Sequence, residues 1–409
     1  MPATSRGTDV DVVVVGARCA GSAAAIAFAR AGRSVVALDA ARFPSATIST
    51  HLLWAGGVAE LDRLGARERV EATTGAPRLP LGYAAVPGAP AVRATYTPVD
   101  GIAYGLCVRR YGLDAALVAT ALEAGADVRE QTRVEDLLWD RGRVTGVVAR
   151  PRHGEPYELR ARLVVGADGR RSTVAALVGA AEPHTWHPNE RACYYAYFAD
   201  LHEDWRSVAA QWRDGAELGT AFPCDGGLTL VLLMPPLARS AAFEADRDGE
   251  YHRTIEAIPP LAQRLTACSR TSRIIGATDL SSYFRRSSGP GWALPGDAGH
   301  FKDPITAQGI RDALRFGRLL GETTAPALDD PARLDPALAA WERRRDDECR
   351  ETYEWTNFVA RAEPVGPLDV ALYTHFSRPE HAHELLDLHS RILRPSEVLT
   401  PEVLAVGGR

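Results

Sequence analysis

The chain has 409 residues, 46% of them hydrophobic, so it can bury a large core, and we expect two closely associated domains. A formal net charge of −5 provides no basic footprint for nucleic acid or for an anionic membrane. The six cysteines form no C-x-x-C pair, and no signal peptide or run of ~20 apolar residues is visible, which predicts a cytoplasmic protein without a disulfide scaffold or a metal site.

The first forty residues predict a strand, a helix and a second strand. The β-branched run 12–15 is typical of a buried parallel strand. A glycine-containing turn at 16–21, a small-residue helix at 22–31 and a strand at 34–38 follow, and the strand ends at Asp39. In such a βαβ unit the helix start receives a pyrophosphate and the acid binds a ribose, although a strand–turn–helix without a ligand is the alternative.

The turn departs at one position from the dinucleotide fingerprint G-x-G-x-x-G. Gly16 permits the tight turn and Gly21 allows close packing of helix and strand, but Arg18 occupies the place of the middle glycine. An outward-pointing guanidinium there would still pair with a phosphate or a flavin. This unit alone does not distinguish NAD from FAD.

Two further motifs follow between residues 110 and 174. The pattern R-x-x-L-D-x-x-L begins at Arg110 and opens a helix that runs to Glu123. The apolar strand 163–167 ends in Asp168-Gly169 and continues as G-A-D-G-x-x-S-x-V.

Residues 191–235 predict four strands, at 192–198, 207–212, 217–222 and 227–234, in an antiparallel sheet. Strand alternation places Tyr195 and Tyr197 on one face and Tyr194, Ala196 and Phe198 on the other. Together with Trp212 and Phe222, the two same-face tyrosines form a candidate pocket for a flat cyclic substrate, with ordinary core packing as the alternative.

The segment 296–310 combines an acid at a strand end, a Pro-containing turn and a helix entrance. Asp297 can bind sugar hydroxyls, and the free N–H groups of the helix that follows can face anionic atoms. The segment also holds His300 and the only lysine of the chain, Lys302. His300 is a candidate base or a structural hydrogen-bond partner, and Lys302 either binds a charged group or faces solvent.

The last eighty residues predict helices. Asp335-Pro336 is typical of a helix start, and the helix is expected to reach Glu363, with Arg343 to Arg345 on a solvated face. Trp355 and Phe358 are expected to pack on the core, and the chain after Pro395 to form a loop or a short cap.

The order of these motifs, ending in G-D-A-G-H at 296–300, resembles that of the single-component FAD-dependent aromatic hydroxylases, also called group A flavoprotein monooxygenases, over residues 9–320. The resemblance implies an α/β fold: a Rossmann-like FAD-binding domain with an inserted antiparallel β-sheet substrate domain and C-terminal helices. The implied boundaries are 1–80, 106–180 and 286–325 for the FAD-binding domain, 81–105 and 181–285 for the substrate domain, and 326–409 for the helical region.

The resemblance also implies site residues. FAD would be held by Gly16, Ala17, Arg18, Ala20, Gly21, Asp39, Arg110, Asp168, Gly296, Asp297, Pro304, Ala307, Gln308, Gly309 and Ile310. Substrate would contact His51, Trp54, Tyr195, Tyr197, Trp212 and Phe222, and His300 and Lys302 are the catalytic candidates.

The implied reaction uses NAD(P)H and dioxygen to hydroxylate an aromatic or polyketide-like small molecule of secondary metabolism through a flavin C4a-hydroperoxide. Ala175 stands where the family usually has an Arg, so a separate flavin reductase is an alternative electron source. A monomer or a homodimer is expected. The alternatives are a flavin-dependent halogenase, a geranylgeranyl-type reductase and a non-catalytic FAD-binding protein, but the W-x-W-x-I-P segment of the halogenases is absent and the Y-x-W-x-F-P element of the reductases is matched only in part, at 353–358.

Overall fold

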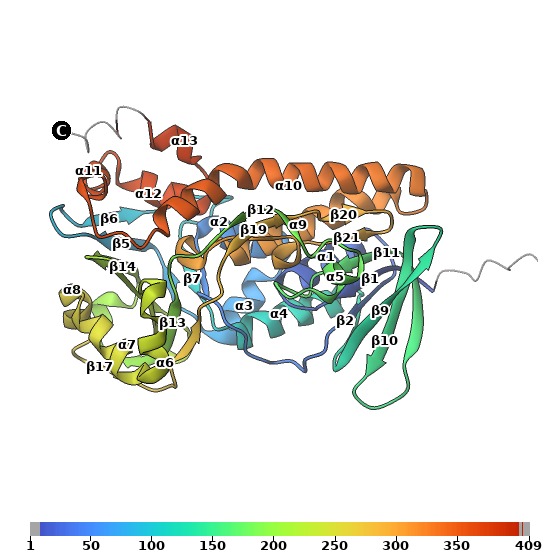
Figure 1. Ribbon diagram of the computed structural model, residues 1–409, viewed down its shortest axis with the longest axis horizontal. Helices are drawn as coiled ribbons and strands as arrows, with labels where there is room; N and C mark the ends of the chain where they lie inside the picture. The colour runs from blue at the N-terminus through green and yellow to red at the C-terminus, as the bar shows by residue number, and fades with distance from the viewer. Residues whose placement is uncertain (1–8, 401–402, 404–409) are drawn as a thin grey trace, which may run out of the picture.

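The computed structural model describes residues 9–400 and residue 403. Its N-terminal sheet has the strand order β20-β21-β11-β1-β2-β8, with the β9–β10 hairpin attached through β11 (Figure 1). The strands are β1 (Val10–Val15), β2 (Val35–Leu38), β8 (Asp127–Arg129), β9 (Thr132–Asp140), β10 (Arg143–Pro151), β11 (Tyr157–Gly166), β20 (Ser288–Gly289) and β21 (Trp292–Ala293). Five of them, β21, β11, β1, β2 and β8, pair in parallel, as the apolar runs predict.

Both faces of this sheet are covered because successive side chains of its central strands are apolar and buried. One face packs against α1 (Cys19–Arg30), α4 (Arg110–Glu123) and α9 (Gly309–Thr324). The other packs against α5 (Thr173–Leu177) and the β9–β10 hairpin. The βαβ unit and the helix at Arg110 are therefore confirmed. Two short helices, α2 (Ala55–Arg63) and α3 (Arg67–Thr74), complete this part.

The second sheet has the order β17-β13-β16-β15-β14-β5-β6, and β18 also pairs with β13. Its strands are β5 (Leu81–Ala85), β6 (Val92–Thr95), β13 (Cys193–Asp200), β14 (Val208–Asp214), β15 (Glu217–Pro223), β16 (Leu228–Leu233), β17 (Cys268–Arg270) and β18 (Ile275–Ala277). The four expected strands are confirmed. All pairs are antiparallel except β14–β5, where a segment from early in the chain joins the sheet in parallel.

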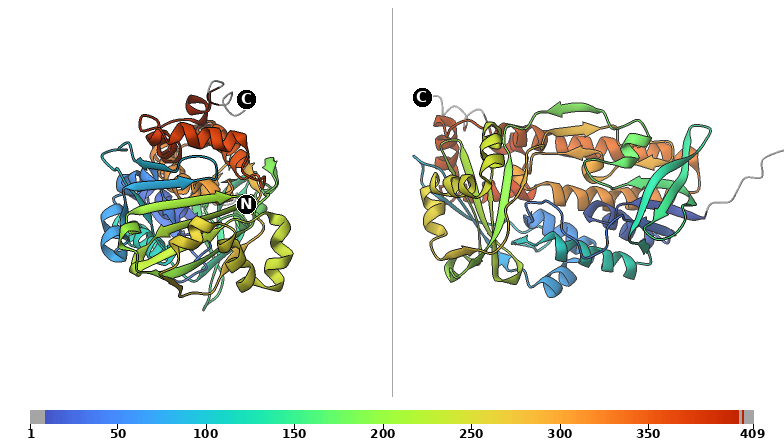
Figure 2. Two further views of the ribbon diagram at one scale, coloured as in Figure 1. Left: turned by 90° about the vertical axis from the view of Figure 1, so that its left-hand side faces the viewer. Right: turned by 60° about the horizontal axis from the view of Figure 1, so that its bottom comes forward.

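The two faces of the second sheet have different neighbours. Tyr194 and Phe198 lie on the face covered by α6 (Ser240–Ala245), α7 (Arg247–Glu256) and α8 (Pro259–Arg264), which form the outer end of the molecule in Figure 2. Tyr195 and Tyr197 lie on the opposite face, as the alternation predicts, and that face is turned to the C-terminal helices.

The C-terminal region consists of α10 (Pro331–Val359), α11 (Pro367–Phe376), α12 (Ala382–Ser390) and α13 (Pro395–Val398). Helix α10 runs along the length of the molecule, from beside the N-terminal sheet to the second sheet (Figure 1). No helix among the described residues combines the length and the apolar character that a bilayer crossing requires.

Two expectations for α10 are wrong. The helix starts at Pro331, not at Pro336, because Asp330 caps it by accepting a hydrogen bond from Ala332 N at 2.9 Å. Arg345 does not lie on a solvated face: only 1% of it is exposed, and it packs over the rings of Phe284 and Trp341.

Of the two aromatic residues expected to pack on the core, Trp355 does so, but Phe358 is 37% exposed because it lies on the outer side of the same helix. Two three-stranded sheets join the larger parts. They are formed by β3 (Leu52–Leu53), β4 (Arg78–Leu79) and β7 (Gly105–Cys107), and by β12 (Pro183–His187), β19 (Ser282–Arg285) and β22 (His300–Phe301).

Candidate functional site

The turn between β1 and α1 has no room for larger residues. Gly16 has φ +93°, and a Cβ atom on it would lie 2.5 Å from the carbonyl oxygen of Ala167. A Cβ atom on Gly21 would overlap the carbonyl oxygen of Gly16. No side chain caps the N-terminus of α1, so its first N–H groups remain available to an anionic ligand.

Asp39 follows β2 and ties the second strand to this turn. Its Oδ2 accepts a hydrogen bond from Ala17 N at 2.8 Å, and its Oδ1 accepts one from Ala41 N at 2.7 Å. The carboxylate therefore lies beside the helix start, at the carboxyl edge of the parallel strands where dinucleotides bind in such folds.

Arg18 and Arg110, from elements far apart in sequence, meet on one buried acid. Asp114 accepts hydrogen bonds from Arg110 Nη2 at 2.8 Å and from Arg18 Nη1, and Arg18 Nη2 also donates to Ser45 Oγ at 2.8 Å. Burial opposes the charge of Arg110, but the neighbouring Cys19 and Asp114 outweigh it, so the pKa of Arg110 is raised. Asp114 positions both guanidinium groups. It was absent from the candidate residues, although it is the acid of the R-x-x-L-D-x-x-L motif.

Asp168 lies at the end of β11 and caps α5. Its oxygens accept hydrogen bonds from Ser172 Oγ at 2.5 Å and from Thr173 N at 2.7 Å. Burial outweighs these bonds and raises the pKa of Asp168. Ala175, in the same helix, is buried, so the position where the family usually has an Arg lies inside the packed core.

The segment 296–310 forms a short 3-10 turn, strand β22, a second 3-10 turn (Pro304–Thr306), and then α9. Ala307 has φ +52°, which turns the chain into the helix, and no side chain caps α9. Burial raises the pKa of Asp297, although Arg170, Arg110 and Lys302 lower it. Among the described residues, no side chain or backbone group donates a hydrogen bond to the Asp297 carboxylate.

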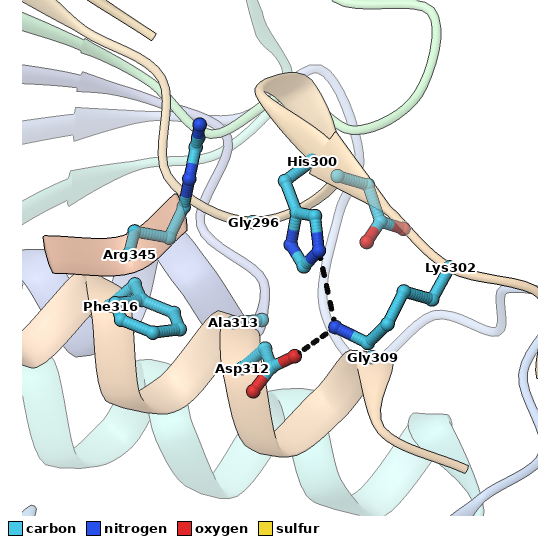
Figure 3. A pocket seen from close by; sticks show the side chains of 9 residues that line it. Gly296, His300, Lys302, Gly309, Asp312, Ala313, Phe316 and Arg345 are labelled. Carbon is cyan, nitrogen blue, oxygen red and sulfur yellow. Dashed lines mark hydrogen bonds and ion pairs between the residues drawn. The ribbon is translucent and has the colours of Figure 1, made fainter. Parts of the chain in front are cut away.

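Within this segment, the side chains of Lys302 and His300 point to each other (Figure 3). Lys302 Nζ lies 3.2 Å from His300 Nε2 and forms an ion pair with Asp312 of α9. Lys302 is 4% exposed, so the expectation of a solvent-facing lysine is wrong. Burial, followed by the charge of Lys302, lowers the pKa of His300 well below its ordinary value. Arg311 pairs with the other oxygen of Asp312 at 2.7 Å. This buried network anchors the segment to α9.

The turn after β1, the acids Asp39 and Asp297, and the two uncapped helix starts fit a dinucleotide cofactor. One further observation concerns Gln308: its Nε2 donates to Thr306 O at 3.2 Å and to His389 O at 2.8 Å, but its buried Oε1 has no partner among the described residues. An unpaired buried acceptor is costly without a ligand. Gln308 Oε1 lies beside the uncapped start of α9, where it would accept a hydrogen bond from an N–H group of an isoalloxazine ring. The residues present therefore fit FAD.

A pocket lies between the second sheet and α12, and we call it the sheet pocket. It is lined by Trp54, Gly82, Tyr83, Ala84, Val92, Ala94, Ala209, Gln211, Phe222, Leu385, Leu386 and His389. It adjoins the 304–309 turn, because Trp54 Nε1 donates to Thr306 O at 3.0 Å and the rings of Trp54 and His389 lie 4.6 Å apart.

His389 is the only histidine of the sheet pocket. Burial lowers its pKa to about 4, so the ring is neutral at pH 7. Its Nδ1 lies 2.7 Å from the carbonyl oxygen of Leu385, which fixes the proton on Nδ1. The Nε2 atom therefore carries the lone pair that a substrate hydroxyl group can donate to.

The substrate candidates fall into three places. Trp54 and Phe222 line the sheet pocket. His51, Tyr195 and Tyr197 form a separate buried cluster. Trp212 packs with Tyr83 and Trp205 on the far face of the sheet, because it alternates with Gln211, which faces the pocket.

In the separate cluster, His51 Nδ1 lies 2.6 Å from Ser49 O and Nε2 lies 2.6 Å from Tyr197 OH. Since a carbonyl oxygen only accepts, Nδ1 donates to it and Nε2 accepts from the Tyr197 hydroxyl. His51 has φ +65°, an unusual backbone conformation for a histidine, and burial lowers its pKa to about 3.

Gln211 and the residues of α12 were not among the candidates. Trp212 was grouped with the tyrosines because it is aromatic, whereas strand alternation would have pointed to its neighbour Gln211. The contribution of Leu385, Leu386 and His389 had no signal in the sequence, because it depends on how a helix from the chain end docks on a sheet formed two hundred residues earlier.

Comparison with known proteins agrees with this geometry. The family model "FAD binding domain" matches residues 9–345. Digeranylgeranylglycerophospholipid reductase 1 of Methanopyrus kandleri is 29% identical, over 92% of this chain and 96% of the relative. Menaquinone reductase of Mycolicibacterium smegmatis is 30% identical, over 81% of this chain and 80% of the relative.

Two solved structures have a similar fold. The flavin-dependent brominase Bmp2 has a TM-score of 0.80 at 18% identity, covering 98% of this chain and 97% of its own. PqsL of Pseudomonas aeruginosa in complex with 2-aminobenzoylacetate has a TM-score of 0.70 at 22% identity, covering 92% and 99%.

The fold and the site together define a flavin-binding oxidoreductase. The chain belongs to the FAD-binding domain family, and it is an FAD-dependent oxidoreductase with the fold expected from its motifs.

Proposed function

We propose that this protein is a monooxygenase that uses FAD to hydroxylate a small, flat, largely apolar molecule of the aromatic or polyketide type. The observation that carries the proposal is the sheet pocket. It lies next to the 304–309 turn, aromatic and aliphatic side chains form most of its lining, and no charged side chain lines it.

Bound FAD supplies the electrons that activate dioxygen, and the residues of this chain do the positioning. Trp54 and Phe222 offer flat apolar surfaces to a ring, while Gln211 and His389 supply the hydrogen bonds that orient it. Helix α12 closes the pocket on the side away from the sheet and keeps water from the reacting ring.

NAD(P)H is the proposed electron donor, acting directly or through a separate flavin reductase. The packed position of Ala175 favours the second route, because this chain has no arginine there to guide a nicotinamide nucleotide. The proposed substrate is an aromatic or polyketide-type molecule of secondary metabolism. Dioxygen is the proposed second substrate.

A second function is reduction of a carbon–carbon double bond in an isoprenoid compound. The relatives favour it, since two that match 92% and 81% of this chain are named as reductases of a geranylgeranyl lipid and of menaquinone. The lining of the sheet pocket disfavours it, because Gln211 and His389 offer hydrogen-bonding groups for which an isoprenoid chain has no partner.

One experiment separates these functions. The purified flavoprotein is mixed with NADH, NADPH or chemically reduced FAD, with and without ¹⁸O₂, in the presence of bicyclic and tricyclic phenols or of short prenyl quinones. Incorporation of one ¹⁸O atom into a phenol supports hydroxylation. A product heavier by two hydrogens and formed without oxygen supports the reductase, and no product with any electron source would leave only FAD binding.

The pocket itself can be tested on strand β6, whose residues alternate between pocket and solvent. Ala94→Leu fills part of the cavity, so we expect KM for the substrate to rise by at least about tenfold while the bound FAD stays unchanged. Thr95→Leu, one residue further and exposed, is the matched control and should leave KM unchanged. Equal effects of the two variants would mean that the substrate binds elsewhere.

A further inference from the structure

We propose that His375, His381 and Glu384 form a binding site for one transition-metal ion, with Zn²⁺ the best fit, at the junction of α11 and α12. The site is separate from the FAD-binding residues. Its chemistry is that of a two-histidine, one-carboxylate set, which zinc binds with a fourth position open to water.

The three side chains already converge. His375 Nε2 lies 2.9 Å from one oxygen of Glu384, and His381 Nδ1 lies 2.8 Å from the other. All donor atoms lie within 4.8 Å of one another. In a tetrahedral zinc site with bonds of about 2.0–2.1 Å, neighbouring donors are about 3.3 Å apart, so small side-chain rotations make room for an ion.

The surroundings allow an ion to enter. The side chains of His375, His381 and Glu384 are 17%, 33% and 19% exposed, so they are neither sealed nor spread over the surface. The imidazole rings are stacked with centroids 4.1 Å apart, so both rings lie on the same side of Glu384. Neutral imidazole nitrogen is a common ligand of Zn²⁺.

A second group of His, Asp and Cys side chains among the described residues differs from this one because a lysine already pairs with its acid. His300, Asp312 and Cys349 also lie close together, but the ammonium group of Lys302 already pairs with the acid. No cationic side chain forms an ion pair with Glu384 among the described residues other than the two histidines themselves.

The position of the site gives the ion a role. Helix α12 supplies Leu385, Leu386 and His389 to the sheet pocket directly after Glu384. Helix α11 reaches the same sheet through Tyr373, whose hydroxyl accepts from Gln211 Nε2 at 3.3 Å. An ion that joins the end of α11 to the start of α12 would fix the wall of the pocket.

Metal binding is measured directly on the FAD-loaded protein after treatment with a chelator and its removal. ZnCl₂ is titrated by calorimetry and the metal content is determined after dialysis. We expect one Zn²⁺ per chain and a higher melting temperature with zinc. In His375→Ala, His381→Ala and Glu384→Gln the affinity should fall by at least about tenfold, since even partners of a ligand contribute that much.

His383→Ala is the matched control, because His383 lies between two of the ligands on the same helix turn but outside the cluster. It should bind zinc like the unmodified protein, and the FAD absorbance confirms that each variant is folded. Absence of stoichiometric zinc in the unmodified protein overturns the proposal. So does zinc binding that the three ligand variants retain, or that His383→Ala loses to the same extent.

Discussion

At the scale of single residues, Asp297 shows why a ligand is expected in this fold. Its side chain is half-buried and no described residue donates a hydrogen bond to its carboxylate, so both oxygens are free to accept one from a ligand. Three cationic side chains lie near enough to lower its pKa, but none forms an ion pair with it among the described residues. A hydroxyl group of a bound ribityl chain would supply the missing donor.

The first prediction follows from this. Asp297→Ala should fold but purify with less than about a tenth of the FAD of the unmodified protein, because it removes a group that serves the ligand and not the protein. The ratio of flavin to protein absorbance measures the occupancy. Asp347→Ala, an exposed acid on α10, is the control and should keep its FAD. Full occupancy in Asp297→Ala would show that the cofactor lies elsewhere.

The roles of residues that depend on the local backbone conformation could be predicted from the sequence. The roles of residues that depend on which side chains surround them in the fold could not. Gly16 lies in the tight turn and Gly21 in the first turn of α1, and both have the close backbone contacts that their spacing predicts. Lys302 has the same formal charge whether it faces solvent or Asp312, so the sequence alone does not reveal its buried ion pair. The cluster at His375 was likewise missed, because its histidines belong to two helices whose angle depends on the tertiary fold.

At the scale of elements, the contact between α1 and α9 decides how closely the two halves of the FAD site approach. A Cβ atom on Gly317 would overlap the carbonyl oxygen of Ala20 and would lie 3.0 Å from the Cβ of Ala23. Both helices begin beside candidate FAD-binding residues: α1 follows Arg18, and α9 follows Gln308. Their separation therefore sets the spacing of the two helix starts.

The second prediction tests this contact. In an isolated helix Gly→Ala is stabilising by roughly 1 kcal/mol. Gly317→Ala should instead lower the free energy of unfolding by about 1–3 kcal/mol and weaken FAD binding, because the helices must move apart. Urea denaturation and FAD titration measure the two effects. Glu322→Ala, on the exposed side of α9, should change neither, and a stabilised Gly317→Ala would show that the helices are not in close contact.

The periodic elements were predictable because their patterns are local. The four strands of residues 191–235 and the helix at Arg110 have the expected type and nearly the expected bounds. The start of α10 was misplaced because Asp-Pro occurs twice in succession, at Asp330 and at Asp335, and only the first acid reaches a free N–H group. The parallel pairing of β14 with β5 joins strands far apart in the chain, which no local pattern encodes.

At the scale of the whole molecule, stability should depend on pH through buried histidines. Burial lowers the pKa of His51 to about 3 and that of His389 to about 4, and it also lowers that of His300. Below the ordinary pKa near 6.5, the unfolded chain binds protons that the folded chain refuses, so stability falls as the pH falls. Asp303 acts in the opposite direction, because burial raises its pKa to about 7.

The third prediction isolates one histidine. Between pH 7 and pH 5 the unmodified protein should lose about 2 kcal/mol more of its free energy of unfolding than His51→Asn, since asparagine tolerates φ +65° but does not titrate. Urea denaturation at the two pH values measures the difference. His153→Asn, at an exposed position, should behave as the unmodified protein. The same pH dependence in His51→Asn would show that this imidazole is protonated freely in the folded state.

The position of α12 in the chain, after the part that the family model matches, affects how the substrate of such a protein can change. The family match stops at residue 345, inside α10, whereas the pocket residues Leu385, Leu386 and His389 all come later. The candidate FAD-binding residues, from Gly16 to Ile310, all come earlier. Substitutions of the α12 side chains that line the pocket can therefore reshape the space for the substrate without replacing any of these residues. A small library confined to α12 is the shortest route to a variant that accepts a different molecule.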